Sequence, residues 1–164
     1  RGMAVKKEKI PVTTRNGKAE IPERLKDLDV KENFAVLATD DAGLPYTSLI
    51  SYALTPDVKT AIFATPKGTR KYRNILNSSQ VALLIDNRSK SKHKLMDTEA
   101  ITIIGTAKHV RKGKKWDELS KIFLRKHPDL EEFLHAQTTA LVAIQITECV
   151  HVSHFQTRSV WNYR

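Results

Sequence analysis

Short apolar segments joined by turn-forming residues, with no helical segment between them, constrain the fold of this chain most. Three such segments, at residues 34–39, 46–54 and 60–65, have the length of β-strands, and a cluster of turn formers separates the first two. Strands joined directly by turns form antiparallel sheets, because a parallel pair needs a longer crossover connection. The first half of the sequence therefore predicts an antiparallel sheet.

Three further strands are predicted in the second half of the chain. They cover residues 81–86, 99 to about 110, and 139 to about 155, the last as one long strand with alternating apolar residues. The predicted fold class is thus mainly β: a six-stranded antiparallel barrel, closed or split, with helices at its edges.

The apolar spacing also predicts short helices, at residues 22–32, 69–76, 114–126 and 128–135. In the second of these, Thr69 is the expected N-cap. Its apolar spacing predicts that Tyr72, Ile75 and Leu76 face the core. Residues 20–164 are expected to form a single domain. Residues 1–19 are mostly polar and lack periodicity, so a flexible arm is expected there.

The single cysteine, Cys149, limits the possible chemistry and suggests a compartment. One cysteine cannot form an internal disulfide or build a multi-cysteine zinc or iron–sulfur site. No apolar run approaches the roughly 20 residues of a membrane helix. A cytoplasmic protein that does not bind membranes is expected.

Basic residues give the chain a net charge of +10, and much of the excess is clustered. The three clusters are Lys67, Arg70, Lys71 and Arg73; Arg88, Lys90, Lys92 and Lys94; and Lys108, Arg111, Lys112, Lys114 and Lys115. Such clusters attract phosphate groups on cofactors, nucleic acids or membranes. For the second and third clusters, solvated charges on loops and helix ends are the simpler interpretation.

The first cluster carries features of a phosphate-binding site. A strand ends at Thr65, a turn contains Gly68, and the following helix begins with Thr69, Arg70 and Lys71. A helix start offers unpaired N–H groups and a positive dipole end to an anion, and Arg70 can bind two phosphate oxygens. The alternative is a capped surface helix with incidental basic residues. The spacing of a nucleotide P-loop is absent.

The order of several short motifs resembles the pyridoxamine 5′-phosphate oxidase-like family of FMN-binding split barrels. These motifs are Leu37-Ala38-Thr39, Gly43-Leu44-Pro45-Tyr46, Phe63-Ala64-Thr65, Thr69-Arg70-Lys71 and Val81-Ala82-Leu83-Leu84-Ile85. The similarity covers roughly residues 33 to 111. It implies a homodimer that binds FMN at the subunit interface.

The resemblance also assigns cofactor-binding residues. The FMN phosphate falls on Thr69, Arg70 and Lys71, and the strand end that contacts phosphate and ribityl chain falls on Ala64 and Thr65. The segment along the isoalloxazine ring falls on Ser48, Leu49, Ile50 and Ser51. The residues that complete the site from the other subunit are assigned to Asn87, Arg88 and Trp161.

The chain departs from the oxidase itself where that enzyme binds its vitamin substrate. Ser48 and Ala53 replace an arginine and a lysine, and residues 157–164 lack an Arg-Leu-His motif. Oxidation of vitamin B6 is therefore not expected. No catalytic side chain is assigned, because a flavin carries the redox chemistry itself. The implied function is an FMN-dependent oxidoreductase acting on a small organic substrate or electron donor.

Several alternatives remain open at this point. A deazaflavin or haem could replace FMN, and the protein could be a non-catalytic flavin or haem sensor or a haem-degrading relative. No metal site is expected, because His151 and His154 are three apart in a predicted strand and point to opposite faces. Tyr46, Tyr52 and Tyr72 could stack on bases, but Tyr72 follows a core spacing and no RNA-recognition motif occurs. Specific nucleic-acid binding is not expected.

Overall fold

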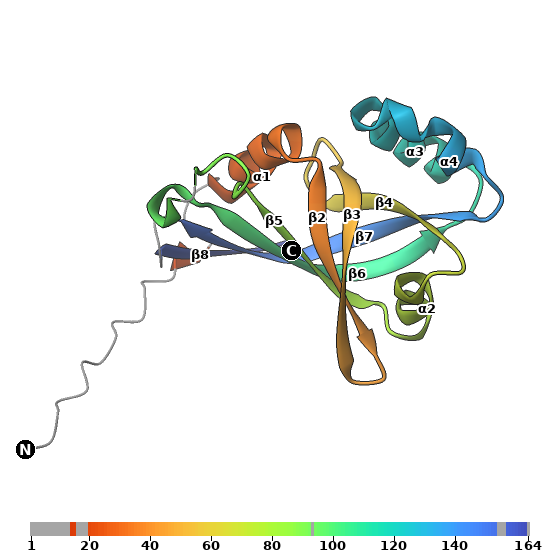
Figure 1. The fold of residues 1–164 in the computed structure, drawn as a ribbon, viewed down its shortest axis with the longest axis horizontal. Helices are drawn as coiled ribbons and strands as arrows, with labels where there is room; N and C mark the ends of the chain where they lie inside the picture. Colours follow the sequence, from red (N-terminus) through yellow and green to blue (C-terminus); the bar gives the residue numbers. More distant parts are fainter. Residues whose placement is uncertain (1–13, 16–19, 93, 154–156, 164) are drawn as a thin grey trace, which may run out of the picture.

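The computed structural model describes residues 14–15, 20–92, 94–153 and 157–163 (Figure 1). The strands are β1 (Thr14–Arg15), β2 (Phe34–Asp41), β3 (Leu44–Leu54), β4 (Thr60–Pro66), β5 (Gln80–Asp86), β6 (Ala100–Val110), β7 (Thr139–Ser153) and β8 (Thr157–Asn162). The α-helices are α1 (Glu20–Lys31), α2 (Arg70–Asn77), α3 (Lys114–Lys126) and α4 (Glu131–His135). Single 3₁₀ turns cover Leu95–Asp97 and Pro128–Leu130.

Six of the strands close into an antiparallel barrel. They pair in the order β7-β4-β3-β2-β5-β6, and β6 pairs with β7 to complete the ring. Closure satisfies the backbone groups that an open sheet would leave unpaired at its edges. The predicted fold class, a six-stranded antiparallel barrel with flanking helices, is confirmed.

The predicted long strand from residue 139 to about 155 is confirmed as β7, which ends at Ser153, but the strand β8, in which the chain returns, was not predicted. One edge of β7 pairs first with β4, where Gln145 lies opposite Thr60, and then with β8, where Glu148 lies opposite Asn162. The returning strand thus satisfies backbone groups of β7 that lie beyond the reach of β4.

The segment predicted as a flexible arm contains the short strand β1. Its two residues pair in parallel with β8, Thr14 opposite Ser159 and Arg15 opposite Val160. Residues 1–13 and 16–19 lie outside the described part of the chain.

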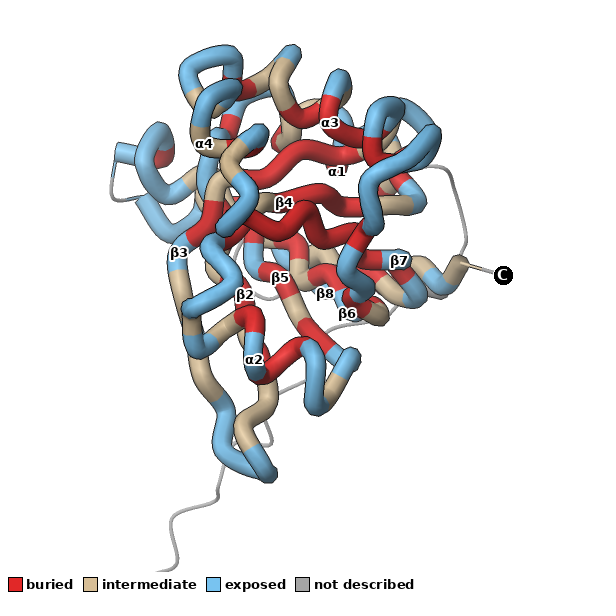
Figure 2. The backbone as a smooth tube through the Cα atoms, turned by 90° about the vertical axis from the view of Figure 1, so that its right-hand side faces the viewer, coloured by how far each residue is buried: buried red, intermediate tan, exposed pale blue. Residues whose placement is uncertain are grey.

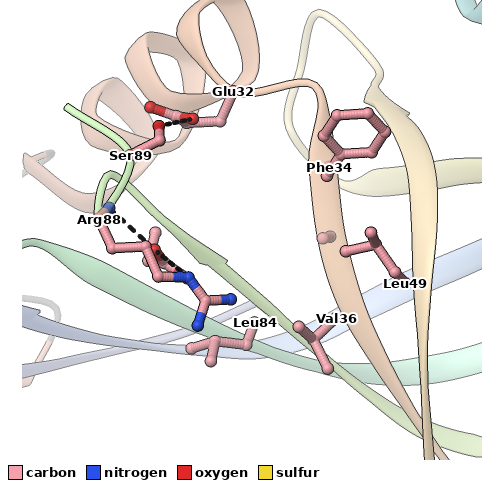
Figure 3. A pocket seen from close by; sticks show the side chains of 9 residues that line it. Glu32, Phe34, Val36, Leu49, Leu84, Arg88 and Ser89 are labelled. Carbon is pink, nitrogen blue, oxygen red and sulfur yellow. Dashed lines mark hydrogen bonds and ion pairs between the residues drawn. The ribbon is translucent and has the colours of Figure 1, made fainter.

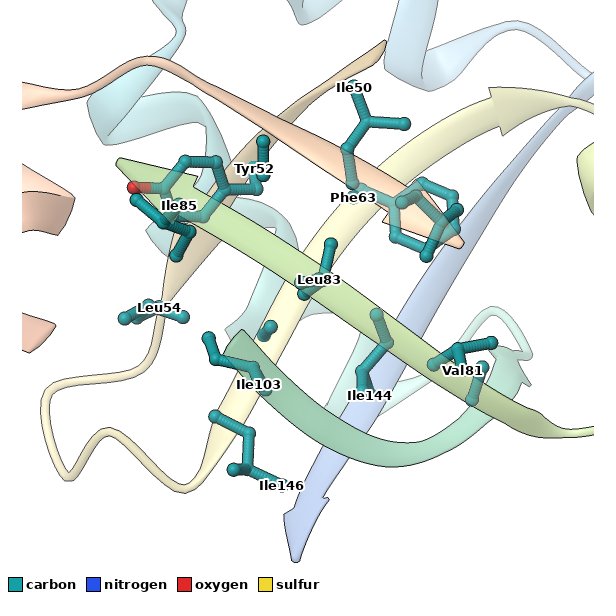
Figure 4. Close-up of a cluster of buried hydrophobic side chains, with 14 of the residues drawn as sticks. Ile50, Tyr52, Leu54, Phe63, Val81, Leu83, Ile85, Ile103, Ile144 and Ile146 are labelled. Carbon is teal, nitrogen blue, oxygen red and sulfur yellow. The ribbon is translucent and has the colours of Figure 1, made fainter. Parts of the chain in front are cut away.

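Large apolar side chains fill the barrel interior. Burial is concentrated in the strands, whereas the β2–β3 turn and the outer surfaces of the helices are exposed (Figure 2). Tyr52, Phe63, Leu83 and Ile103 are all fully buried in this core (Figure 4). Burying such side chains stabilises the fold by about 1.5–3 kcal/mol each, before the entropy cost of ordering them.

A second, smaller core lies between the outside of the barrel and the helices α3 and α4. Ala53, Ile62 and Leu141 on the strands belong to the same buried cluster as Trp116 and Phe123 on α3. The predicted amphipathic helix at residues 114–126 is therefore confirmed in both extent and buried face.

A β-bulge between β6 and β7 depends on Gly105. Ile104 pairs with Glu148 but Gly105 pairs with Ile146, so Thr147 is the extra residue. A Cβ atom on Gly105 would lie 2.4 Å from the backbone oxygen of Gln145, so no larger residue fits without moving the chain.

Helix α2 begins as predicted and buries two of the three residues that were expected to face the core. Thr69 is its N-cap, and Tyr72 and Ile75 are buried. The prediction that Leu76 is buried is wrong, since its side chain is 61% exposed. Asn74 is buried instead and donates to Thr39 Oγ1 at 3.0 Å. Asn74 and Leu76 lie about 200° apart around the helix, so only one of them can face β2.

Candidate functional site

Two threonine hydroxyls meet where β4 ends and α2 begins. Thr65, which is 1% exposed, places its Oγ1 atom 2.8 Å from Oγ1 of Thr69. The Thr69 hydroxyl donates to the Pro66 carbonyl at 2.9 Å and accepts the Tyr72 N–H at 3.4 Å. This side chain therefore fixes the turn and satisfies one of the first N–H groups of the helix.

The start of α2 is electrostatically suited to an anion. Its first turn carries no acidic residue and includes Arg70 and Lys71. The helix dipole adds partial positive charge at the same end, and an anion there is stabilised by typically about 0.3–1 kcal/mol at an exposed site. The structure thus brings together Thr65, Thr69, Arg70 and Lys71.

Arg70 is held by the β2–β3 hairpin. Its Nε and Nη2 atoms donate to the same Asp41 oxygen at 3.1 and 2.9 Å, and its guanidinium lies 4.4 Å from the centre of the Tyr46 ring. Sequence reasoning missed Asp41 and Tyr46 as neighbours of the site. They lie far from Arg70 along the chain, and only the hairpin register brings Asp41 and Tyr46 near each other.

The four predicted ring-contacting residues of β3 alternate between its two faces. Ser48 and Ile50 pair with Leu37 and Ala35, both buried, and share the inner face of β3. Ile50 is a core residue, so only its backbone is available to a ligand. The Ser48 hydroxyl is buried and has no hydrogen-bond partner among the described residues. A buried hydroxyl without a partner costs about 1–3 kcal/mol, which a ligand atom at hydrogen-bonding distance would recover.

Leu49 and Ser51 lie on the outer face of β3. Leu49 is 65% exposed and lines a shallow cavity of about 220 Å³ with Phe34, which is 59% exposed (Figure 3). Arg88 lies at the same cavity, where its Nε atom is 3.2 Å from Asp86 Oδ1. The structure therefore brings Leu49 and Arg88 together on an apolar outer face of the barrel.

Ala64 differs from its neighbour Thr65 in orientation. Thr65 pairs with Ala140 of the barrel core, whereas Ala64 packs against the second core beneath α3 and α4. The side chain of Ala64 therefore points away from the α2 start, and only its backbone could contact a ligand there.

Asn87 and Trp161 lie apart from the α2 start within the chain. Asn87 closes the loop after β5, donating to the Asp97 carbonyl at 3.2 Å and accepting the Glu99 N–H at 2.7 Å. Trp161 lies on β8, at the opposite end of the molecule from α2 (Figure 1). One protomer does not bring these residues together with Thr69.

A partly buried ionic cluster links α1, the residue before β6, and β7. The Glu99 carboxylate accepts from Arg24 Nε at 2.6 Å and from Arg24 Nη2 at 2.5 Å, and its Oε2 atom lies 2.7 Å from His151 Nε2. Burial raises the pKa of Glu99, but the hydrogen bonds from Arg24 and His151 outweigh it and hold that pKa below its ordinary value. The cluster borders a cavity of about 370 Å³ that Met96 also lines.

The described residues also bear on metal binding and on membrane insertion. No group of three or more His, Cys, Asp or Glu side chains lies close enough together there to hold a metal ion. None of the helices in that part of the chain is long and apolar enough to cross a membrane.

Comparison with known proteins identifies relatives of the whole domain. A protein-family profile described as pyridoxamine 5′-phosphate oxidase matches residues 20–152. No curated protein matches the sequence.

Solved structures share the fold at low sequence identity. A haem-binding protein from Mycobacterium smegmatis superimposes with a TM-score of 0.73 at 14% identity, over 82% of this chain and 55% of that one. The present chain thus spans little more than half of that relative. HutZ, the haem storage protein from Vibrio cholerae, gives 0.65 at 19% identity, over 76% and 88% of the two chains. A FAD-binding protein from Mesorhizobium loti gives 0.62 at 16%, over 82% and 93%.

Proposed function

Because the chain belongs to the pyridoxamine 5′-phosphate oxidase-like family of split barrels, we propose that it binds FMN and acts as an FMN-dependent oxidoreductase. The observation that carries the proposal is the pair of hydroxyls on Thr65 and Thr69, 2.8 Å apart at the positive end of α2. Together with Arg70 and Lys71, they supply hydroxyl donors and positive charge to one phosphate group.

Residues of β3 next to the start of α2 could contact the rest of a bound flavin. Tyr46 and Ser48 follow one another on the inner face of β3, and Arg70 stacks on Tyr46. The partnerless Ser48 hydroxyl therefore lies one step along the strand from the residue that orients Arg70. In the proposed complex, Ser48 hydrogen bonds to the cofactor beyond its phosphate. Bound flavin would supply hydride or single-electron transfer, while the chain binds and orients it.

The proposal includes a homodimer with flavin at the subunit interface. Its support is an exposed apolar surface on the outside of the barrel, here called the outer apolar face. Its members lie beside one another on β2, β3 and β5: Phe34, Val36, Leu49 and Leu84. Contiguous exposed apolar surface of this kind marks an interaction site. A second copy covering it would bring its own Asn87, Arg88 and Trp161 to complete the site.

The substrate proposed is a small organic molecule other than pyridoxamine phosphate. Ala53, at the position where the oxidase resemblance expects a substrate-binding lysine, is 1% exposed and packed beneath α3. The buried methyl group of Ala53 offers no charge or hydrogen bond to a substrate phosphate. The proposal also places the protein in the cytoplasm, where the Cys149 thiol would stay reduced.

Flavin binding followed by flavin reduction tests this function. The purified protein is incubated with FMN and desalted, and its absorbance is followed anaerobically after addition of NADH or NADPH. Retention of a flavin band that bleaches with the donor supports an oxidoreductase. A retained band that no donor bleaches would make the protein a flavin carrier or sensor, and no retained flavin would contradict the proposal.

Haem binding is a second candidate, favoured by the environment of His151. Its Nε2 atom is fixed by Glu99, so its other ring nitrogen is available to iron, and the cavity beside it also contains Met96. Titration with haemin should then produce a Soret band that His151→Ala removes, while FMN binding stays unchanged. A Soret band that persists in His151→Ala would show that His151 is not the haem ligand, and no Soret band in the wild-type protein would contradict haem binding.

A further inference from the structure

The topology of the barrel brings together two basic clusters that are far apart in the sequence. Strands β4 and β6 both run antiparallel to β7, on either side of its first residues, since Thr65 pairs with Ala140 and Val110 pairs with Leu141. Both strands therefore end at the same end of the barrel. The turns that follow them carry Lys67 and Arg111, from the first and third clusters.

A ring contact links helix α2 to the end of β6. The Tyr72 ring meets the His109 ring edge-on, with centroids 5.9 Å apart and an interplanar angle of 86°. His109 pairs with Val142, two residues from the Ala140 that pairs with Thr65, so His109 and Thr65 face the same side of the sheet. His109 thus lies on the side of the barrel end where the paired hydroxyls lie.

The charges at this end of the barrel are not balanced by acids. The pKa of His109 is lowered by burial and then by the positive charges of Lys67 and Arg111, so the three basic groups are near enough to repel one another. In the described part of the chain, Lys67, Lys71 and Arg111 form no ion pair, and the acid at this end, Asp41, pairs with Arg70. Gathered like charges destabilise the fold unless an anion binds among them.

One FMN phosphate carries at most two negative charges. In the proposed complex it binds at the start of α2, beside Arg70 and Lys71. We infer that Lys67, His109 and Arg111 form a second anion subsite, which binds a further phosphate of a dinucleotide beside the FMN phosphate. This inference rests on the proposed function. The second phosphate has two chemical sources: the pyrophosphate of FAD, if the cofactor is the larger flavin, or a phosphate of a nicotinamide dinucleotide that donates electrons.

Arg111→Gln tests the subsite, with Lys108→Gln as the matched control. Lys108 is on the same strand and loses the same charge, but it pairs with Ala143 of the second core and faces the opposite side of β6. The affinities for FMN and FAD are measured by flavin fluorescence on the full chain, and the affinity of FMN-loaded protein for NADP⁺ by calorimetry.

We expect Arg111→Gln to weaken FAD or NADP⁺ binding about tenfold, the loss of one charge-assisted contact, and FMN binding less than about twofold. A loss for FAD alone assigns the second phosphate to the cofactor, and a loss for NADP⁺ alone assigns it to the donor. Two results would overturn the inference even if the protein binds FMN. In the first, Arg111→Gln and Lys108→Gln change the affinities for FAD and NADP⁺ equally. In the second, Arg111→Gln weakens FMN binding as much as it weakens the binding of FAD or NADP⁺. Wild-type protein that binds no FMN would instead overturn the proposed function, and the subsite with it.

Discussion

Thr69 combines a structural role with the proposed binding role, and a pair of substitutions separates them. Asn and Asp both cap helices well, so Thr69→Asn and Thr69→Asp should unfold within about 0.5 kcal/mol of the wild-type protein. The aspartate adds a negative charge where the phosphate would bind, so it should abolish FMN binding, while the asparagine variant keeps measurable affinity. Urea unfolding and flavin fluorescence provide the two readings. Equal FMN affinities in the two variants would show that the phosphate does not approach Thr69.

Cys149 should be chemically silent in the folded protein. Burial, followed by the nearby negative charge of Glu148, raises the pKa of its thiol to about 12, so almost no thiolate exists at pH 8. We expect Ellman's reagent to react with the native protein at pH 8 far more slowly than with the protein in guanidinium chloride. Equally fast reaction in the two states would show that the thiol is accessible and that this part of the barrel opens readily.

The sequence predicted the residues of the α2 start because a cap and its following turn are local signals. It could not predict that Arg70 pairs with Asp41, because that contact depends on the register of a distant hairpin. It also misjudged Leu76, because the face of a short helix is chosen by a single tertiary hydrogen bond, here that of Asn74.

At the scale of the element, the bulge in β7 opposite β6 gives a sharp prediction for Gly105. Gly105→Ala forces a methyl group to 2.4 Å from the backbone oxygen of Gln145 and to 2.8 Å from Cγ2 of the buried Ile144 side chain. We expect a loss of about 3 kcal/mol in the free energy of unfolding, at the upper end of typical overpacking. The matched control is Gly68→Ala, because nothing lies within 4 Å of a Cβ built at that glycine. Equal unfolding midpoints for the two variants would contradict the close approach of β6 and β7.

The Arg24–Glu99–His151 cluster should make the docking of α1 pH-dependent. Because the pKa of Glu99 is lowered in the folded protein, its carboxylate stabilises the fold above its ordinary pKa of 4.5, and this contribution is lost as the pH falls through the folded-state value. Glu99→Gln should therefore cost about 2 kcal/mol at pH 7, less than a fully buried pair because Arg24 is partly exposed. In urea unfolding, the cost should shrink below pH 4.5. A deficit that is constant from pH 7 to pH 3 would show that the charge of Glu99 is not the cause.

The helix α3 and the six strands of the barrel, which have their own local pattern, were predicted, whereas β1 and β8 were not. The amphipathic spacing at residues 114–126 predicted α3 correctly. The strand β8 was not predicted because Val160 and Trp161 are its apolar residues and form no alternating pattern. Its strand conformation depends on pairing with β7. Strand propensity depends strongly on such context.

At the scale of the whole molecule, the outer apolar face predicts assembly. Leu49→Asp places a charge in this face and should convert a dimer into a monomer in light scattering coupled to size-exclusion chromatography. Leu95→Asp, at an equally exposed leucine in the loop after β5, is the matched control and should remain dimeric. If the partner completes the site, the monomeric Leu49→Asp variant should also retain less FMN than the wild-type protein. A wild-type protein that is monomeric at all concentrations would contradict the homodimer.

The sequence predicted the order of strands that forms the closed barrel. It did not predict that basic residues from two separate clusters lie at the same end of that barrel. Lys67 and Arg111 are separated by 44 positions in the numbering and are brought to one end by β7. No local pattern carries that information, because it arises only when the barrel closes.

The affinity difference between FMN and riboflavin tests the central claim most directly, because the two flavins differ only in the phosphate. If the start of α2 binds that phosphate, the wild-type protein should bind FMN roughly 100-fold more tightly than riboflavin, about 2.7 kcal/mol. The double variant Arg70→Ala, Lys71→Ala should reduce the difference to a few-fold and leave the riboflavin affinity unchanged. Equal affinities in the wild-type protein, or an undiminished difference in the double variant, would contradict the account.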